Sequence, residues 1–410
     1  MTKLVKREYW LPFILVTSLF FIWGFARSIM DVLNKHYQTE LDITISQSTA
    51  IQGVFFLGYF LLAIPAGFFI TKYGYRKGVV FGLLLFGLGA ICFGLGSSWF
   101  DMSGMNVFYL FLASLFVVAC GLVFLETAAN PYMTELGSAE TAASRLNLAQ
   151  SFNGLGNICG PWLGGIILFS GSGSSLATPY IIIGGMVLVL ALLFSRVNLP
   201  EIQEDSEKAE DLASAKPLLA NRLFVFGFIA LLAYEIAEIS INSLFVNYAE
   251  TERGINKLTA SEWLSFGFVL FMCARFAGSW LMSKVPAEKV LLCCSIGSAF
   301  SCLIVFLNIG KLSMLGLMLN YLFEAIMFPT IFSLALRNLG SQTKRASSYL
   351  MLSTIGGAIG TVLMGVLADK INLSFSFIVP LASFLVVLAY SWRVNTVTSG
   401  QAPKRKGNPT

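Results

Sequence analysis

Acidic residues inside long apolar runs are the first feature of this sequence that could do chemistry. Asp31, Glu126 and Glu324 each lie in such a run, as do Glu235 and Glu238. If these runs cross a bilayer, the carboxyl groups are costly there and normally face a cavity or a partner, which makes them candidates for a functional site. Glu126 has no charged residue within a helical turn. Because burial favours the neutral carboxyl group, we expect Glu126 to bind and release protons near neutral pH.

Asp31 follows Arg27 by one helical turn, near the outer end of its apolar run. This spacing fits a structural ion pair within one helix. It equally fits a carboxyl group that works with Glu126 in proton coupling, which is the role we assign to it. The sequence leaves open whether Glu235 and Glu324 titrate or form ion pairs with Arg27 or Arg275.

Side-chain amides form a stripe on the apolar segment 146–170. Asn147, Gln150, Asn153 and Asn157 recur at spacings of three, three and four residues, which places them on one helical face. Amides both donate and accept hydrogen bonds, as sugar hydroxyls require, and they would be costly against lipid. The stripe therefore predicts contacts with a hydroxyl-rich ligand. Hydrogen bonds between helices without a ligand are the alternative.

Other motifs indicate packing rather than chemistry. Gly154, Gly156 and Gly160 have the spacing G-x-G-x-x-x-G inside an apolar segment with no preceding strand, so we expect them to pack helices closely rather than bind a dinucleotide. The seven cysteines lack metal-ligand spacing. His36 is expected to be a loop residue. We predict no metal site and no cofactor.

The elements that carry these residues follow from composition. Of 410 residues, 56% are apolar and 12% are charged, whereas soluble domains average roughly 25% charged residues. Because about 20 apolar residues span a membrane, the chain predicts an all-α polytopic membrane protein. Twelve apolar segments are expected at residues 10–33, 47–71, 78–98, 106–133, 146–170, 177–197, 222–248, 260–283, 288–308, 311–336, 346–368 and 373–393.

One polar stretch divides the segments six and six. It predicts an N-terminal six-helix bundle at 1–197, a cytoplasmic linker at 198–221, and a C-terminal six-helix bundle with a basic tail at 222–410. Lys and Arg cluster in alternate loops and at both ends, so we expect both termini on the cytoplasmic side of a bacterial inner membrane. The positive net charge of +5 belongs to this topology, and we expect no nucleic-acid partner.

The two halves resemble each other in sequence. Offsets of 198 to 200 residues relate Glu126 to Glu324 and Gly156 to Gly356, together with the prolines and arginines near them. Such internal symmetry predicts two homologous bundles with a substrate site at the midplane between them.

Several motifs are similar to those of a known family. GFFITKYGYRK at 67–77 resembles the cytoplasmic signature of the major facilitator superfamily, with Thr71 where an aspartate is usual. SLFFIWGFARSIMDVLNKH at 18–36, LETAANPYMTELG at 125–137, SRLNLAQSFNGLG at 144–156 and FPTIFSLALRNLG at 328–340 resemble the fucose permease family of sugar:proton symporters, through nearly all of both halves.

The resemblance implies roles for individual residues. The family's acids for proton coupling and sugar recognition fall on Asp31 and Glu126. The expected substrate-binding residues are Arg27, Gln52, Asn130, Asn147, Gln150, Asn153, Glu238, Asn242 and Glu324.

We therefore expect a monomeric secondary transporter in the lipid bilayer that takes up a hexose or deoxyhexose, such as glucose, galactose or fucose, together with a proton, by alternating access. A sodium-coupled sugar transporter and a sugar or drug exporter are the alternatives within the transport class. A sugar-sensing receptor would need a signalling domain, for which the linker and tail leave no room. No nucleophile with a base and no metal-binding histidine cluster is visible, so we expect no enzyme activity.

Overall fold

The computed structural model describes residues 9–99, 104–136, 142–169, 177–196, 218, 220–282, 284–337, 339, 346 and 349–401. Within these ranges the chain is helical and contains no β-strand. Ten helices there are long and apolar enough to cross a membrane, and a shorter apolar helix covers Tyr180–Arg196. α6 (Ala142–Phe169) is the remaining long helix of the described part, and its amide-bearing and glycine residues make it less apolar. The prediction of an all-α polytopic fold is confirmed.

The first group of helices precedes the polar stretch. It comprises α1 (Trp10–Leu41), α2 (Ile45–Ser48), α3 (Ala50–Tyr73), α4 (Tyr75–Trp99), α5 (Met105–Glu135), α6 and α7 (Ala177–Arg196). Within it, α1 packs along α6, and α4 packs against both α5 and α7. Most of the predicted linker 198–221 lies outside the described residues.

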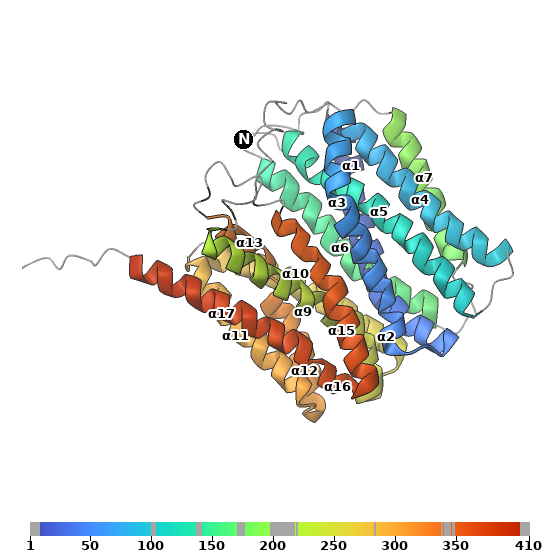
Figure 1. Cartoon of the computed structure of the whole chain (residues 1–410). Coiled ribbons are helices and arrows are strands. Elements are labelled where there is room, and N and C mark those ends of the chain that lie inside the picture. Colours follow the sequence, from blue (N-terminus) through green and yellow to red (C-terminus); the bar gives the residue numbers. More distant parts are fainter. Residues whose placement is uncertain are drawn as a thin grey trace, which may run out of the picture.

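The second group follows it. It comprises α9 (Arg222–Arg253), α10 (Lys257–Met282), α11 (Ala287–Phe306), α12 (Gly310–Glu324), α13 (Met327–Ala335), η6 (Leu352–Ile355), α15 (Gly356–Lys370), α16 (Leu373–Ser376) and α17 (Ile378–Gln401). Here α9 packs against α15 and α17, and α11 packs against α12 and α17. Figure 1 shows the two groups side by side, the first in blue to green and the second in yellow to red.

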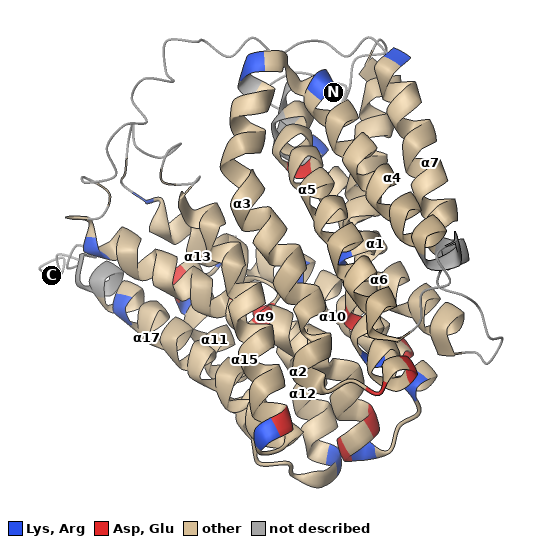
Figure 2. Cartoon of the chain, turned by 45° about the vertical axis from the view of Figure 1, so that its right-hand side comes forward, with Lys and Arg blue, Asp and Glu red and all other residues tan. Residues whose placement is uncertain are grey.

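Each group buries its own apolar core. Phe20, Phe55 and Phe111 belong to the core of the first group, and Tyr248 and Phe384 to that of the second. Large apolar side chains also remain exposed on the outside of the helices, and charged residues lie mainly at the helix ends (Figure 2). This distribution suits helices surrounded by hydrocarbon.

Glycines bring helices of each group into backbone contact. A Cβ added at Gly156 of α6 would lie 2.3 Å from the Phe21 carbonyl oxygen of α1. A Cβ at Gly356, its sequence equivalent in α15, would lie 2.6 Å from the Leu232 carbonyl oxygen of α9. Both distances are too short for a side chain, so only glycine permits this approach. The predicted packing role of the glycine motif is confirmed, and the repeat is visible as equivalent contacts in both groups.

The segment predicted as one helix at 311–336 is two helices. α12 ends at Glu324 and α13 begins at Met327. Pro329 has no N–H to donate to the Ala325 carbonyl oxygen four residues earlier, which frees that acceptor. Arg275 of α10 donates to it instead, with 2.9 Å between Nε and the oxygen.

Two other expectations were wrong in their local detail. α1 ends at Leu41 rather than near residue 33, so Asp31 lies ten residues before its end and not close to it. His36 is therefore no loop residue: it is 9% exposed within α1 and packs against Tyr37 and Phe169. A helix can continue past its apolar run when neighbouring helices pack against its polar end. Hydropathy along the sequence does not reveal such packing.

The two groups contact each other on the side where α1 ends and α2 lies, called here the α2 side. α6 packs against α10, α1 against α9, and both α2 and α3 against α15. Towards the opposite side the ribbons of the two groups diverge (Figures 1 and 2).

Candidate functional site

A small cavity lies between the two groups of helices. α1, α3 and α6 contribute from the first group, and α9 and α10 from the second. The lining residues are Arg27, Ser28, Met30, Asp31, Gln52, Phe56, Asn157, Glu238, Ile239, Asn242, Phe268 and Phe271.

Arg27 links the two groups at this cavity. Its guanidinium lies 3.7 Å from the Glu238 carboxylate of α9, and it stands 5.9 Å from the centre of the Phe56 ring. The ion pair is loose, and the side chains keep 31% and 12% of their exposure. Arg27 thus takes its ion-pair partner from the other group of helices, and Asp31 lies within electrostatic reach of the same guanidinium.

Asp31 and Gln52 meet on the first-group wall of the cavity. The Asp31 side chain is 6% exposed, and the Gln52 amide from α3 lies beside its carboxyl group. Gln52 is 1% exposed, and neither of its amide atoms has a partner of good hydrogen-bond geometry within the described part of the chain. Buried polar atoms normally have partners, and the Asp31 carboxyl group is the partner that the Gln52 amide meets on this wall.

Glu126 of the first group is not among the residues that line the cavity. It is half-buried on α5, where the Tyr59 hydroxyl and Arg27 lie close enough to interact with its carboxylate. Thr127 directs its hydroxyl to the Val123 carbonyl oxygen of the same helix and is not aimed at Glu126. The structure therefore brings Glu126 and Asp31 to the same guanidinium from two different helices.

α9 presents a polar face to the cavity. Glu235, Glu238 and Asn242 follow one another at spacings of three and four residues, so they share one side of the helix. Glu235 is 4% exposed and interacts electrostatically with Glu238, Arg27 and Glu126. The Asn242 Oδ1 atom is buried without a hydrogen-bond partner in the described ranges.

Charge at the site is unbalanced. Arg27 is within interaction distance of carboxyl groups on Asp31, Glu126, Glu235 and Glu238. Four carboxylates around one guanidinium at membrane depth would leave several unpaired buried charges, each costly.

The amide stripe of α6 divides between packing and cavity. Gln150 donates to the Asn130 side-chain oxygen at 3.3 Å, and Asn153 donates to the Phe20 carbonyl oxygen at 3.1 Å. Both bonds join helices, as in the alternative interpretation of the stripe. Asn157, which donates to Asn153 at 3.3 Å, lines the cavity. The Asn147 side chain lies outside the described residues.

Glu324 lies away from the cavity wall. It is fully buried at the end of α12, and neither carboxyl oxygen has a hydrogen-bond partner in the described part of the chain. Glu238 and Arg275 are its charged neighbours. The break after Glu324 places its carboxyl group next to the turn that Arg275 stabilises.

Sequence reasoning missed several cavity residues. Phe268 and Phe271 of α10 line it from the second group, at a spacing of three residues within an ordinary apolar segment. Nothing in that pattern distinguishes them from residues that face lipid. Asn157 was within the predicted stripe, and its position nearest the centre of α6 was the available signal.

Comparisons with known proteins agree with this geometry. Residues 16–289 and 223–409 match the model of the Major Facilitator Superfamily. The chain belongs to the major facilitator superfamily. It is 34% identical over 424 residues to the L-fucose-proton symporter of Escherichia coli, covering 96% of this chain and 95% of that one. It is 33% identical over 398 residues to a glucose/galactose transporter of Brucella abortus, with 94% of each chain covered.

A solved structure shows the same relationship. A crystal structure of a superfamily transporter, FucP, in the outward conformation aligns with a TM-score of 0.69 and 33% sequence identity, covering 95% of this chain and 99% of that chain. The resemblance to the fucose permease family is therefore confirmed, as is the twelve-helix fold of the superfamily. The chain is a multi-pass membrane transporter and not an enzyme.

Proposed function

We infer that this protein is a hexose:proton symporter of the bacterial inner membrane that works by alternating access. The observation that carries the proposal is the position of Arg27, which stands in an inter-group cavity and faces carboxyl groups from both groups of helices. The relatives named above transport L-fucose with protons or transport glucose and galactose. We take the two groups as the rocking domains at 1–197 and 222–410, joined by a cytoplasmic linker.

The residues divide into proton and sugar roles. Glu126 binds the proton, and Asp31 senses it through Arg27 while it accepts a hydrogen bond from a sugar hydroxyl. Gln52, which lies beside the Asp31 carboxyl group, and Asn242, whose Oδ1 atom is buried without a hydrogen-bond partner in the described ranges, bind sugar hydroxyls on opposite walls. Phe56 supplies an apolar surface for the sugar ring. Asn130, Gln150, Asn153 and Glu324, which do not line the cavity, support these residues, and Asn147 keeps its predicted role in sugar binding.

Symport requires that proton and sugar favour the same conformational step. Here each ligand changes the charge or the hydrogen bonding around one guanidinium that touches both groups, so each changes the same contact between them. In this topology both termini are cytoplasmic, and the α2 side faces the periplasm. The carrier is proposed to act as a monomer, because one chain supplies both walls of the cavity.

The first test is external pH in lightly buffered, de-energised cells that express this chain. Fucose, galactose, glucose and N-acetylglucosamine are added in turn. Alkalinisation with one sugar supports proton symport and identifies the substrate. No pH change, together with sodium-dependent uptake of labelled sugar, would replace proton coupling by sodium coupling.

The second test is Glu126→Gln, with the exposed Glu40→Gln as a matched control. The neutral variant should exchange sugar across the membrane but lose accumulation. One proton carries about 2.3 kcal/mol per 100 mV, which is about fortyfold accumulation. Retained uphill uptake in the variant, at the level of the control, would exclude Glu126 as the proton carrier.

A further inference from the structure

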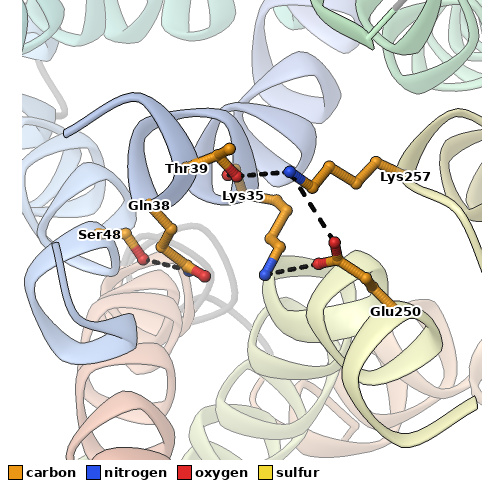
Figure 3. A network of polar contacts seen from close by, with 6 residues as sticks. All are labelled: Lys35, Gln38, Thr39, Ser48, Glu250 and Lys257. Atoms are coloured by element: carbon orange, nitrogen blue, oxygen red, sulfur yellow. Dashed lines mark hydrogen bonds and ion pairs between the residues drawn. The ribbon is translucent and has the colours of Figure 1, made fainter. Parts of the chain in front are cut away.

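Polar side chains tie the two groups together beyond the cavity, on the α2 side. Lys35 of α1 pairs with Glu250 of α9 at 2.6 Å. Lys257, at the start of α10, lies 3.8 Å from the same carboxylate and donates to the Thr39 hydroxyl at 2.7 Å. Figure 3 shows that Lys35 and Lys257 each meet a different oxygen of the Glu250 carboxylate. Two of these three contacts cross from one group to the other.

A second cross-group contact lies at the start of α2. The Asp369 carboxylate, near the end of α15, accepts the backbone N–H groups of Ile45 and Ser46 at 3.0 and 2.8 Å. The first N–H groups of a helix have no partner within the helix and carry a partial positive charge. A carboxylate of the second group therefore satisfies donors of the first.

The two contacts are joined through the first group. Gln38 of α1 donates to the Ser48 hydroxyl of α2 at 2.7 Å, so α1 and α2 are held to each other. Lys35 lies one helical turn beyond Asp31, and Glu250 lies eight residues, about 12 Å along the helix, beyond Asn242. The contacts thus lie beyond the cavity, towards the ends of α1 and α9 on the α2 side.

We propose that Glu250 and Asp369 are gating residues that hold the periplasmic entrance shut, and that the carrier must break both contacts to admit sugar. This inference rests on the proposed topology, in which the α2 side is periplasmic. The contacts are suited to reversible opening because they are partly exposed: Lys35 keeps 15% and Glu250 keeps 30% of side-chain exposure. Contacts of this kind bias an equilibrium about two- to fivefold each rather than fixing it.

The proposal predicts a kinetic signature that a structural role would not give. A ligand binds a fractionally populated state with an apparent affinity reduced by that fraction. Loss of a gating contact raises the outward-open population, so the apparent KM for external sugar should fall about two- to fivefold. A residue needed only for folding would lower the amount of active carrier and leave KM unchanged.

The matched control lies in the same helix. Glu252 is two residues from Glu250, and its carboxylate accepts from Asn308 at 2.7 Å within the second group. It therefore does not cross between the groups. Glu250→Gln and Asp369→Asn should both change the gate, whereas Glu252→Gln should not.

The experiment measures access to a buried site from outside the cell. Ser261 is fully buried where α10 meets Gly165 of α6, four residues after Lys257. Ser261→Cys is introduced into the full-length, membrane-embedded carrier with its native cysteines replaced, and labelling by a membrane-impermeant maleimide is followed over time. Glu250→Gln and Asp369→Asn should each accelerate labelling about two- to fivefold.

The outcomes separate the gate from the transport function. Unchanged labelling and unchanged KM in both variants would overturn the gate. Lys35→Gln removes the partner from the other group, so it should reproduce the effect of Glu250→Gln, and the double variant should show no further increase. Labelling needs neither sugar nor protons, so accelerated labelling without any sugar transport would support the gate while it refuted the proposed substrate.

Discussion

Replacement of Arg27 is the perturbation with the largest expected effect on transport. At 3.7 Å, its attraction to Glu238 is about 4.5 kcal/mol for an effective dielectric constant of about 20. Desolvation and the 31% exposure of the Arg27 side chain reduce this gross attraction. Truncation of one partner of such a pair lowers the interaction free energy by about 2 kcal/mol or more. Much of this loss comes from the other charge, which is left buried and unpaired. Arg27→Gln should therefore lower kcat/KM for labelled-sugar uptake about thirtyfold.

A double-mutant cycle tests the reasoning behind this magnitude. Glu238→Gln should lower kcat/KM less than Arg27→Gln does, because Arg27 still faces three other carboxyl groups in that variant. The double variant should be no worse than Arg27→Gln, since the second change then removes an acid that has already lost its cation. Initial rates are compared at equal amounts of carrier in the membrane.

Arg337→Gln serves as the control for loss of an arginine. Arg337 pairs with Glu288 at 2.5 Å within the second group, remote from the cavity lining. It should leave KM unchanged. Losses at Arg27 and Glu238 that simply multiply in the double variant would refute an energetic link between the two groups through this pair.

Two further predictions concern packing and charge within the groups. A Cβ at Gly160 would lie 2.0 Å from the Ser28 hydroxyl, so Gly160→Ala should destabilise the α1–α6 contact by about 1–3 kcal/mol, seen as a lower Tm in detergent, whereas Gly185→Ala, with nothing within 4 Å, should not. Glu324→Gln should leave Tm within about 2 °C of the wild type, because an unpartnered buried carboxyl group has no hydrogen bond to lose and is costly to ionise. A large drop in Tm would show instead that Glu324 is charged and paired with Arg275.

The sequence was sufficient to predict which acidic residues lie within the membrane-spanning helices. A carboxyl group inside an apolar run is conspicuous whatever the rotation of its helix, so the sequence alone indicates Asp31, Glu126 and Glu238 as candidates. The glycine contacts were equally predictable. Two helices can approach this closely only where a residue has no side chain. The equivalent positions Gly156 and Gly356 both meet this condition.

The partner of each charge could not be predicted. Sequence spacing favours Asp31 as the partner of Arg27, because the two lie one turn apart on the same helix. The structure gives Arg27 its ion pair with Glu238, more than 200 residues away, because that pairing depends on how the two groups pack. The amide stripe is a similar case: periodicity placed its members on one face but did not reveal that Gln150 and Asn153 meet other helices while Asn157 meets the cavity.

The two halves pack their helices in equivalent ways, but their equivalent acidic residues have different surroundings. Glu126 and Glu324 occupy equivalent sequence positions, each five residues before a proline. α5 continues unbroken through Glu126, whose carboxyl group interacts with Arg27, the residue that joins the two groups at the cavity. The chain breaks after Glu324, and Arg275 is held by the carbonyl oxygen released there. In the proposed mechanism, the two equivalent scaffolds rock against each other. The unlike environments of the equivalent acids are the reason that this mechanism assigns the proton to Glu126 and not to Glu324.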